Sequence, residues 1–367
     1  MKIEDEHGLM KKSFILIVCL CAACASVSHK FFDDDIYSKR FITSIMRKVC
    51  DWQIANPVEL NSKNSNKWAR SAFYTGVMAA YSTTQDETYL DQAVTWAEAE
   101  GWKAGERPRH ADDHTCGQTY LEIYFLKKDP AMIADIKSTF DSVINNPKPG
   151  REDWWWCDAL FMAPPVLSRL AAATGDDRYL AVMNAMWWDT TDFLYDEDEG
   201  FYYRDKRFIG KLNANGQKIF WSRGNGWVMG GIIRVLEYLP EDNPYFNRYI
   251  GLLRTMAVSV AGVQGEDGLW RTSLFDPDEA PAPETSGSGF FCYALAWGVN
   301  NGYLDRETYE PVVKQAWAGL VSAVHSSGKL GWVQEIGHKP EDVSRDDNQE
   351  YGSGAFLLAG SEMVKLK

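Results

Sequence analysis

The sequence has little that would bind nucleic acid. Its formal net charge is -13, and no run of Lys and Arg interrupts that acidic balance. Nucleic-acid binding needs such clusters, because each neutralised phosphate releases counterions. A P-loop is also excluded, since no Gly-Lys-Ser or Gly-Lys-Thr follows a strand-like segment. We therefore expect no nucleic-acid partner, and the positive charge that binds any anionic ligand must be local.

Closely spaced cysteines are lacking as well. The residues that follow the leader include Cys50, Cys116, Cys157 and Cys292, and no two of them have the short spacing that binds zinc. A chain of 367 residues can build its core without disulfides. The sequence thus predicts neither a metal site nor a disulfide scaffold.

No apolar run is long enough to cross a membrane. Lys11 and Lys12 precede a short apolar stretch from Phe14 to about Cys21, and small residues follow through Ala25. This stretch is far short of the roughly 20 residues that a spanning helix needs. Residues 1–25 are therefore predicted to be a signal peptide.

Two cleavage sites fit this leader. Cleavage after Ala25 would release a periplasmic protein, whereas cleavage before Cys24 would follow a loose bacterial lipoprotein box and leave a lipid on Cys24. We expect an exported bacterial protein, either periplasmic or attached to the outer membrane through that lipid.

The rest of the chain has no Pro-, Gly- or Ser-rich linker, so residues 30–367 are predicted to form one domain. Acidic openers able to cap helices recur along it, followed by amphipathic stretches; they lie at residues 85–87, 128–130, 175–177, 241–243 and 304–306. Between them lie apolar helical segments, near residues 68–81, 113–126, 158–173, 226–239, 286–299 and 350–364.

With a first helix near residues 36–54, these segments give roughly twelve helices. Helices with a single apolar face alternate along the chain with helices that are apolar on all sides. Helices of the second kind belong inside, so the fold class is all-α, a six-hairpin (α/α)6 barrel. Residues 200–210 alternate and predict a short β insertion, a strand or hairpin, and residues 265–283 a long loop. The loops that open the inner helices should share one end of the barrel.

The most unusual stretch is Trp154 to Pro165, which places Asp158 among aromatic and apolar residues. Such surroundings raise the pKa of a carboxyl, which makes Asp158 the first candidate for a general acid. A structural alternative is that Asp158 faces the dipole of a helix start while the tryptophans only pack.

Other polar sets open the remaining inner helices. Residues 109–114 supply Asp112 and Asp113 for acid–base chemistry, substrate contact, metal binding or capping. In residues 221–227, Trp221 can stack on a sugar ring, and Arg223 can hold a carboxylate with two parallel bonds. Residues 284–289 and 346–354 open the fifth and sixth inner helices and can equally be simple caps. Free N–H groups at these helix starts would suit an anionic sugar.

Three motifs together carry a family resemblance: Trp-x-Asp-x-Leu-Phe-Met at residues 156–162, Trp-x-Arg-Gly-Asn-Gly-Trp at 221–227 and Gln-Glu-Tyr-Gly-x-Gly-Ala-Phe at 349–356. In these the chain resembles the unsaturated rhamnogalacturonyl hydrolases of glycoside hydrolase family 105 and, more distantly, the unsaturated glucuronyl hydrolases of family 88. The resemblance covers nearly all of the chain after the leader and also implies a six-hairpin barrel.

The resemblance implies removal of a 4,5-unsaturated uronic acid from the non-reducing end of lyase products. An Asp protonates C4 of the double bond and assists the addition of water at C5, so the usual carboxylate pair about a glycosidic bond is not required. No metal or other cofactor is implied, and the partner is an unsaturated oligosaccharide.

Matched by motif, Asp158 is the catalytic residue and Asp113 its supporting carboxylate, with Asp112 as the competing assignment. Trp156, Met162, Trp221 and Arg223 match positions that line the substrate. Arg204 stands where better-known members have His, so the resemblance leaves open whether the uronyl group is galacturonyl or glucuronyl.

Other functions remain possible on the residues alone. A conventional glycosidase or a polysaccharide lyase can use the same barrel, and a non-catalytic glycan-binding protein would need no acid at position 158. These alternatives differ in whether Asp158 is needed for turnover.

Overall fold

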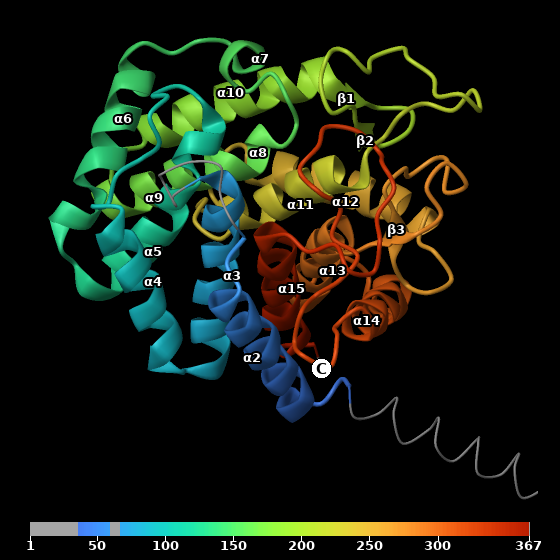
Figure 1. The fold of residues 1–367 in the computed structure, drawn as a ribbon. Helices are drawn as coiled ribbons and strands as arrows, with labels where there is room; N and C mark the ends of the chain where they lie inside the picture. Colours follow the sequence, from blue (N-terminus) through green and yellow to red (C-terminus); the bar gives the residue numbers. More distant parts are fainter. Residues whose placement is uncertain (1–35, 59–66, 367) are drawn as a thin grey trace, which may run out of the picture.

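The structure is a computed structural model that describes residues 36–58 and 67–366. Helices dominate it and form two concentric rings (Figure 1). The inner ring consists of α3 (Trp68–Thr84), α5 (Cys116–Lys127), α8 (Ala159–Met162) with α9 (Pro164–Thr174), α11 (Ser222–Leu236), α13 (Thr285–Asn300) and α15 (Glu350–Met363). Neighbours in this order pack together, and α15 closes the ring against α3.

The outer ring consists of the helices that precede each inner one: α2 (Lys39–Ala55), α4 (Glu87–Ala99), α6 (Ala134–Asn145), α10 (Arg178–Leu194), α12 (Phe246–Gly262) and α14 (Arg306–Ser322). Burial separates the two kinds of helix. Every residue of α11 is buried, whereas α12 buries one face through residues such as Leu253, Met256 and Val260 and exposes the other. The predicted all-α barrel of inner and outer helices is confirmed.

The acidic openers work as caps. Asp86 accepts a hydrogen bond from the backbone N–H of Thr88, and Asp305 accepts one from that of Thr308, at the starts of α4 and α14. Asp129 caps the short 3-10 helix η2 (Pro130–Ile133) in the same way. These bonds satisfy backbone donors that a helix start leaves unpaired.

Several helix limits differ from those predicted. The first helix begins at Lys39 because Ser38 caps it by accepting from the N–H of Phe41. The predicted helix over residues 158–173 is divided into α8 and α9, since Pro164 and Pro165 have no N–H with which to continue α8. A 3-10 helix, η1 (Ala111–His114), precedes α5, and a single turn, α7 (Gly150–Asp153), precedes the Trp154 stretch.

The β insertions are smaller than the sequence suggests. Strand β1 (Tyr195–Asp196) pairs with β2 (Phe201–Tyr202), so the hairpin begins before the predicted range of 200–210 and most of that range is loop. Within the other predicted loop, β3 (Trp270–Arg271) pairs with β4 (Pro283–Glu284). Isolated bridges join Trp156 to Asp205 and Trp221 to Ser273, which fixes both insertions to the end of the barrel where inner helices begin.

Two other predictions concern the cysteines and the leader. All four cysteines from Cys50 onward are free and buried. The predicted signal peptide and Cys24 lie outside the described residues. Among the described helices, none combines the length and apolar character needed to cross a bilayer.

Candidate active site

A small cavity opens at the end of the barrel where the inner helices start. Its volume is about 160 Å³. Seven of the eight predicted site residues line it; the full lining is Trp68, Asp112, Trp156, Asp158, Met162, Arg204, Trp221, Arg223, Ile336 and Gly337. Asp113 is the predicted residue that the cavity does not include.

Asp158 stands at the start of α8 with 8% of its surface exposed. Its side chain makes no capping bond to the helix, although it occupies the N-cap position. The carboxylate instead forms an ion pair with Arg204, whose Nε lies 3.3 Å from Oδ2. Backbone bonding fixes the pair, because the N–H of Cys157 donates to the carbonyl of Arg204.

Asp112 faces the same cavity from η1, with 21% of its side chain exposed. Burial, and then the negative charge of Asp158, raise the pKa of Asp112 from 3.8 to about 7. His110 lies nearby, its Nδ1 3.7 Å from a carboxylate oxygen of Asp112, and burial lowers the pKa of that imidazole. The cavity therefore holds a carboxyl that keeps its proton close to neutral pH.

Asp113 turns away from the cavity. Its carboxylate accepts from the backbone N–H of Arg107 at 2.7 Å and from the guanidinium Nη2 at 2.6 Å. Although burial acts to raise the pKa of Asp113, these bonds outweigh it and lower that pKa. Of the two adjacent carboxylates that the sequence left open, Asp112 is the one that the structure brings to Asp158.

Asp205 holds two arginines at the mouth of the cavity. Fully buried itself, it accepts from Nη1 of Arg204 and from Nη2 of Arg207, each at 2.8 Å from the same oxygen. Burial opposes its ionisation, but the bonds from Arg207 and Arg204 lower the pKa of Asp205 to about 2. Arg204 thus reaches the cavity in a fixed orientation, with its guanidinium 5.4 Å from the ring of Trp155.

Arg223 lines the cavity and also makes hydrogen bonds within the protein. Its Nη1 and Nη2 donate to the backbone carbonyls of Gln334 and Glu335, both at 2.8 Å. Its guanidinium lies 4.3 Å from the Trp221 ring, and that indole donates to the Gln334 side chain. Arg223 therefore both lines the cavity and holds the segment that precedes α15.

That segment contributes Ile336 and Gly337, which sequence reasoning missed because an irregular loop has no periodicity to mark it. Trp68 was also missed, although its place at the start of the first predicted inner helix was a signal.

Two N–H groups at the start of the fifth inner helix, α13, are not free to bind a ligand. The carboxylate of Glu284 accepts from the N–H groups of Ser286 and Gly287, so these donors of α13 are already used.

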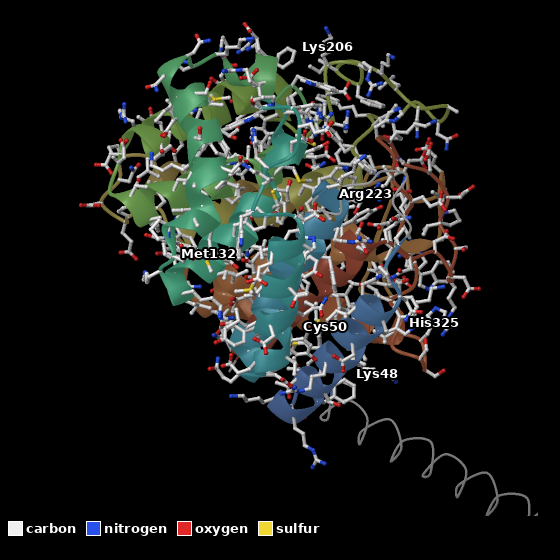
Figure 2. All side chains as sticks on the ribbon, turned by 60° about the vertical axis from the view of Figure 1, so that its left-hand side comes forward. Lys48, Cys50, Met132, Lys206, Arg223 and His325 are labelled. Carbon is white, nitrogen blue, oxygen red and sulfur yellow. The ribbon has the colours of Figure 1, made fainter. Side chains whose placement is uncertain are left out.

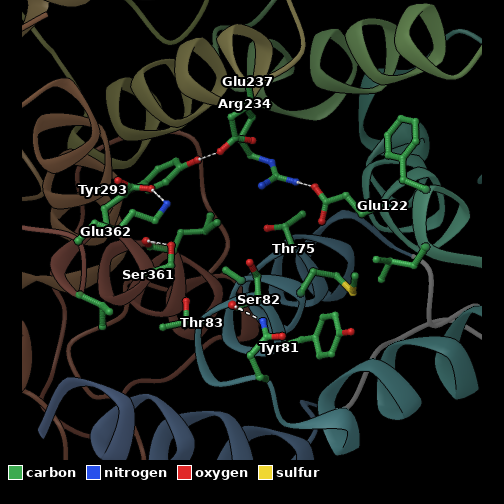
Figure 3. Close-up of a pocket in the computed structure, with 18 of the residues that line it drawn as sticks. Thr75, Tyr81, Ser82, Thr83, Glu122, Arg234, Glu237, Tyr293, Ser361 and Glu362 are labelled. Atoms are coloured by element: carbon green, nitrogen blue, oxygen red, sulfur yellow. Dashed lines mark hydrogen bonds and ion pairs between the residues drawn. The ribbon is translucent and has the colours of Figure 1, made fainter. Parts of the chain in front are cut away.

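A larger cavity of about 750 Å³ lies among the C-terminal ends of the inner helices (Figure 3). None of the predicted site residues lines it. Its charged groups face one another: Glu122 pairs with Arg234, Tyr293 donates to Glu237, and Lys365 donates to Glu362. Because these groups are mutually satisfied, we interpret this cavity as a structural ion network rather than a catalytic site.

No group of three His, Cys, Asp or Glu side chains suited to hold a metal occurs in the part of the chain that the structure describes. The smaller cavity is lined by two carboxyls, two arginines and aromatic side chains.

Comparisons with known proteins agree with this geometry. The family model described as Glycosyl Hydrolase Family 88 matches residues 37–367. An "Unsaturated 3S-rhamnoglycuronyl hydrolase" of Formosa agariphila is 40% identical over 98% of this chain and 100% of its own length. A protein of the same description from an Alteromonas species is 36% identical over 87% of this chain and 85% of its own.

Two solved structures match closely. A glycosyl hydrolase of family 88 from Bacteroides vulgatus superposes with a TM-score of 0.84 at 32% identity, covering 90% of this chain and all of that one. A protein named Polysaccharide Lyase BACCELL_00875 superposes with a TM-score of 0.82 at 36% identity, covering 89% of this chain and 97% of that one.

Proposed function

Because this chain belongs to glycosyl hydrolase family 88, we propose that it removes a 4,5-unsaturated uronic acid from the non-reducing end of lyase-generated oligosaccharides. One observation carries this proposal: Asp112 and Asp158 face one cavity, and the pKa of Asp112 is raised to about 7. A carboxyl that keeps its proton near neutral pH beside a second carboxyl allows one of the two to act as an acid while the other acts as a base.

The proposed reaction is the hydration of an enol ether. Asp158 delivers a proton to C4 of the double bond, and a water molecule adds its hydroxyl to C5 while its own proton returns to the carboxyl pair. The hemiketal formed at C5 opens by breaking the bond between C5 and the ring oxygen, which leaves a ketone at C5 and a hemiacetal at C1. This hemiacetal then breaks its bond to the remaining saccharide, which leaves as an alcohol. Asp112 keeps the shared proton beside Asp158 between turnovers.

The substrate is acidic, and Arg204 is the cationic group beside Asp158 in the cavity. A planar guanidinium in a fixed position can bind the carboxylate of the uronyl group. Both of the similar hydrolases carry "3S-rhamnoglycuronyl" in their names, which we read as a glycuronyl group on a 3-sulfated rhamnose. We propose that class, rather than unsaturated galacturonyl-rhamnose, as the substrate of this chain.

A lyase activity is the second candidate, favoured by the name of one close structural neighbour. The two reactions change the ultraviolet absorbance of the conjugated double bond in opposite directions, because a lyase creates this bond and the proposed hydrolase consumes it. Purified protein is therefore added both to the saturated polysaccharide and to the unsaturated disaccharide.

Loss of absorbance on the disaccharide alone supports the hydrolase, and a gain on the polysaccharide would establish the lyase instead. Asp158→Asn tests the assignment of the proton donor. This variant should bind the disaccharide and leave its absorbance unchanged, and turnover by the variant would remove Asp158 from its role.

We propose in addition that the protein is exported, with the leader supporting either a periplasmic form or a lipid on Cys24. Cys24→Ser distinguishes them. If a lipid attaches at Cys24, the native protein sediments with membranes and the variant does not. Equal fractionation of the two would exclude the lipoprotein form.

A further inference from the structure

The loop after β2 concentrates positive charge in an acidic protein. Residues 204–211 contain two arginines and two lysines but only one acidic residue, whereas the whole chain carries a formal net charge of -13. Lys206 lies at the outer edge of the barrel end that contains Arg223 (Figure 2). The local positive charge that an anionic ligand requires is thus found beside the cavity, outside its walls as well as within them.

Asp205 binds two arginines of this loop, and their side chains point in different directions. Arg204 and Arg207 donate to the same carboxylate oxygen, each at 2.8 Å, so the two donor nitrogens lie no farther apart than twice that distance. Arg204 has 15% of its side chain exposed and points to Asp158. Arg207, by contrast, has 50% of its side chain exposed and does not line the cavity.

Arg207 is held firmly for a half-exposed arginine. Its backbone N–H, Nε and Nη2 all donate to Asp205, at 2.8 to 2.9 Å, and no other hydrogen bond of Arg207 is found in the described part of the chain. Because a guanidinium has five N–H groups, donors remain for a ligand. The entropy of ordering this side chain is already lost in the free protein, which favours binding.

The residue after Arg207 packs toward the loop that lines the cavity. Phe208, the next residue, has its ring 6.4 Å from that of His338, and the neighbouring Ile336 and Gly337 line the cavity. We take a disaccharide to have its uronyl group against Asp158 and its second sugar on the side of Ile336 and Gly337. A substituent on that sugar would meet Arg207 as the fixed cation.

We propose that Asp205 presents two arginines to one disaccharide: Arg204 to the carboxylate of the uronyl group and Arg207 to a sulfate ester on the adjoining sugar. The assignment rests on the proposed function, since it uses the same cavity and substrate class. A sulfate that bridges to Arg207 makes charge-assisted hydrogen bonds whose position is set by the shared carboxylate, so sulfated and unsulfated substrates are distinguished.

The test compares kcat/KM for the unsaturated uronyl-rhamnose disaccharide with and without a 3-sulfate. In the native protein the sulfated substrate should be preferred. Arg207→Gln should reduce this preference by roughly 10- to 100-fold, the loss expected for a hydrogen bond between charged groups. The effect should appear mainly in KM, since the sulfate takes no part in the chemical step.

Arg178→Gln is a matched control. Arg178 donates through its backbone N–H, Nε and Nη2 to Asp176, two residues earlier, as Arg207 does to Asp205, but at the start of α10 beside the end of α9. This variant should keep the native preference.

The outcomes separate the two proposals. An unchanged preference in Arg207→Gln, with both substrates turned over, would overturn the sulfate assignment alone. An equal loss on both substrates would also overturn it, because Arg207 would then only support the loop. Turnover of neither substrate by the native protein would overturn the proposed function and the sulfate assignment with it.

Discussion

Replacing Asp112 with Asn removes its ionisation while keeping the size of the side chain. The native carboxyl is held beside the negative charge of Asp158, and its pKa is raised from 3.8 to about 7. A raised pKa in the folded state means that folding favours the protonated form. Stability from this site is therefore complete below the unfolded pKa and is lost as the pH rises through the folded value.

The size of the effect follows from the shift. Each pKa unit corresponds to about 1.36 kcal/mol, so a shift of about three units sets an upper bound of about 4 kcal/mol above pH 7. At about pH 5 the native protein has already lost about 1.6 kcal/mol of this, because the unfolded carboxyl is ionised there and the folded one is not. The free energy of unfolding of Asp112→Asn, relative to that of the native protein, should thus rise by roughly 2 kcal/mol between about pH 5 and pH 8.

Thermal unfolding at the two pH values measures this gain. With an unfolding entropy of about 2.1 cal/mol/K per residue, about 2 kcal/mol corresponds to a relative rise in Tm of roughly 3 °C for a domain of this size. The Asn variant should be inactive at both pH values. In the native protein kcat/KM should fall as the pH passes about 7, because the shared proton is lost.

Asp113→Asn is the control at the adjacent residue, where the pKa shift has the opposite sign. The pKa of Asp113 is lowered, so its contribution is present above the unfolded pKa and fades only as the pH falls through the lower folded value. This variant should be less stable than the native protein by the same amount at about pH 5 and pH 8. If Asp112→Asn showed no pH-dependent gain, or Asp113→Asn showed one, the assignment of the two carboxylates would be refuted.

Three further predictions concern the surroundings of the site. Arg223→Ala should lower kcat/KM by roughly tenfold or more and make the loop before α15 sensitive to proteases, because the carbonyls of Gln334 and Glu335 lose charge-assisted bonds; unaltered kinetics and cleavage would contradict this. Glu122→Gln should destabilise the barrel by about 3 to 5 kcal/mol in a urea titration while activity is retained, since buried Arg169 and Arg234 lose their shared partner. Gly76→Ala should lower Tm, because an added Cβ would lie 2.7 Å from the Cα of Gly354, whereas Gly251→Ala on α12 meets nothing within 4 Å and should raise stability by about 0.5 to 1 kcal/mol.

The sequence predicted the barrel because each inner helix is apolar on all sides and each outer helix on one, a pattern that only two rings satisfy. It could not separate Asp112 from Asp113, because that depends on whether the chain enters α5 through an α-helical or a 3-10 turn. The structure has the 3-10 turn, η1, and the two adjacent side chains diverge. Nor could it predict that Arg223 binds loop carbonyls, since those carbonyls belong to a segment more than a hundred residues away.

The expectation that helix starts would bind the anionic sugar does not hold at α13, and the distribution of cations points to where specificity lies. The N–H groups of Ser286 and Gly287 at the start of α13 are taken by Glu284, and Arg223 uses two of its five N–H groups on the loop before α15. Two further cations beside the cavity come from the loop after β2, Arg204 and Arg207. Arg207 does not line the cavity, so its charge can change without altering the carboxyl pair, whereas Arg204 forms an ion pair with Asp158. A substitution of Arg207 should accordingly change which adjoining sugar is preferred and leave the hydration chemistry intact.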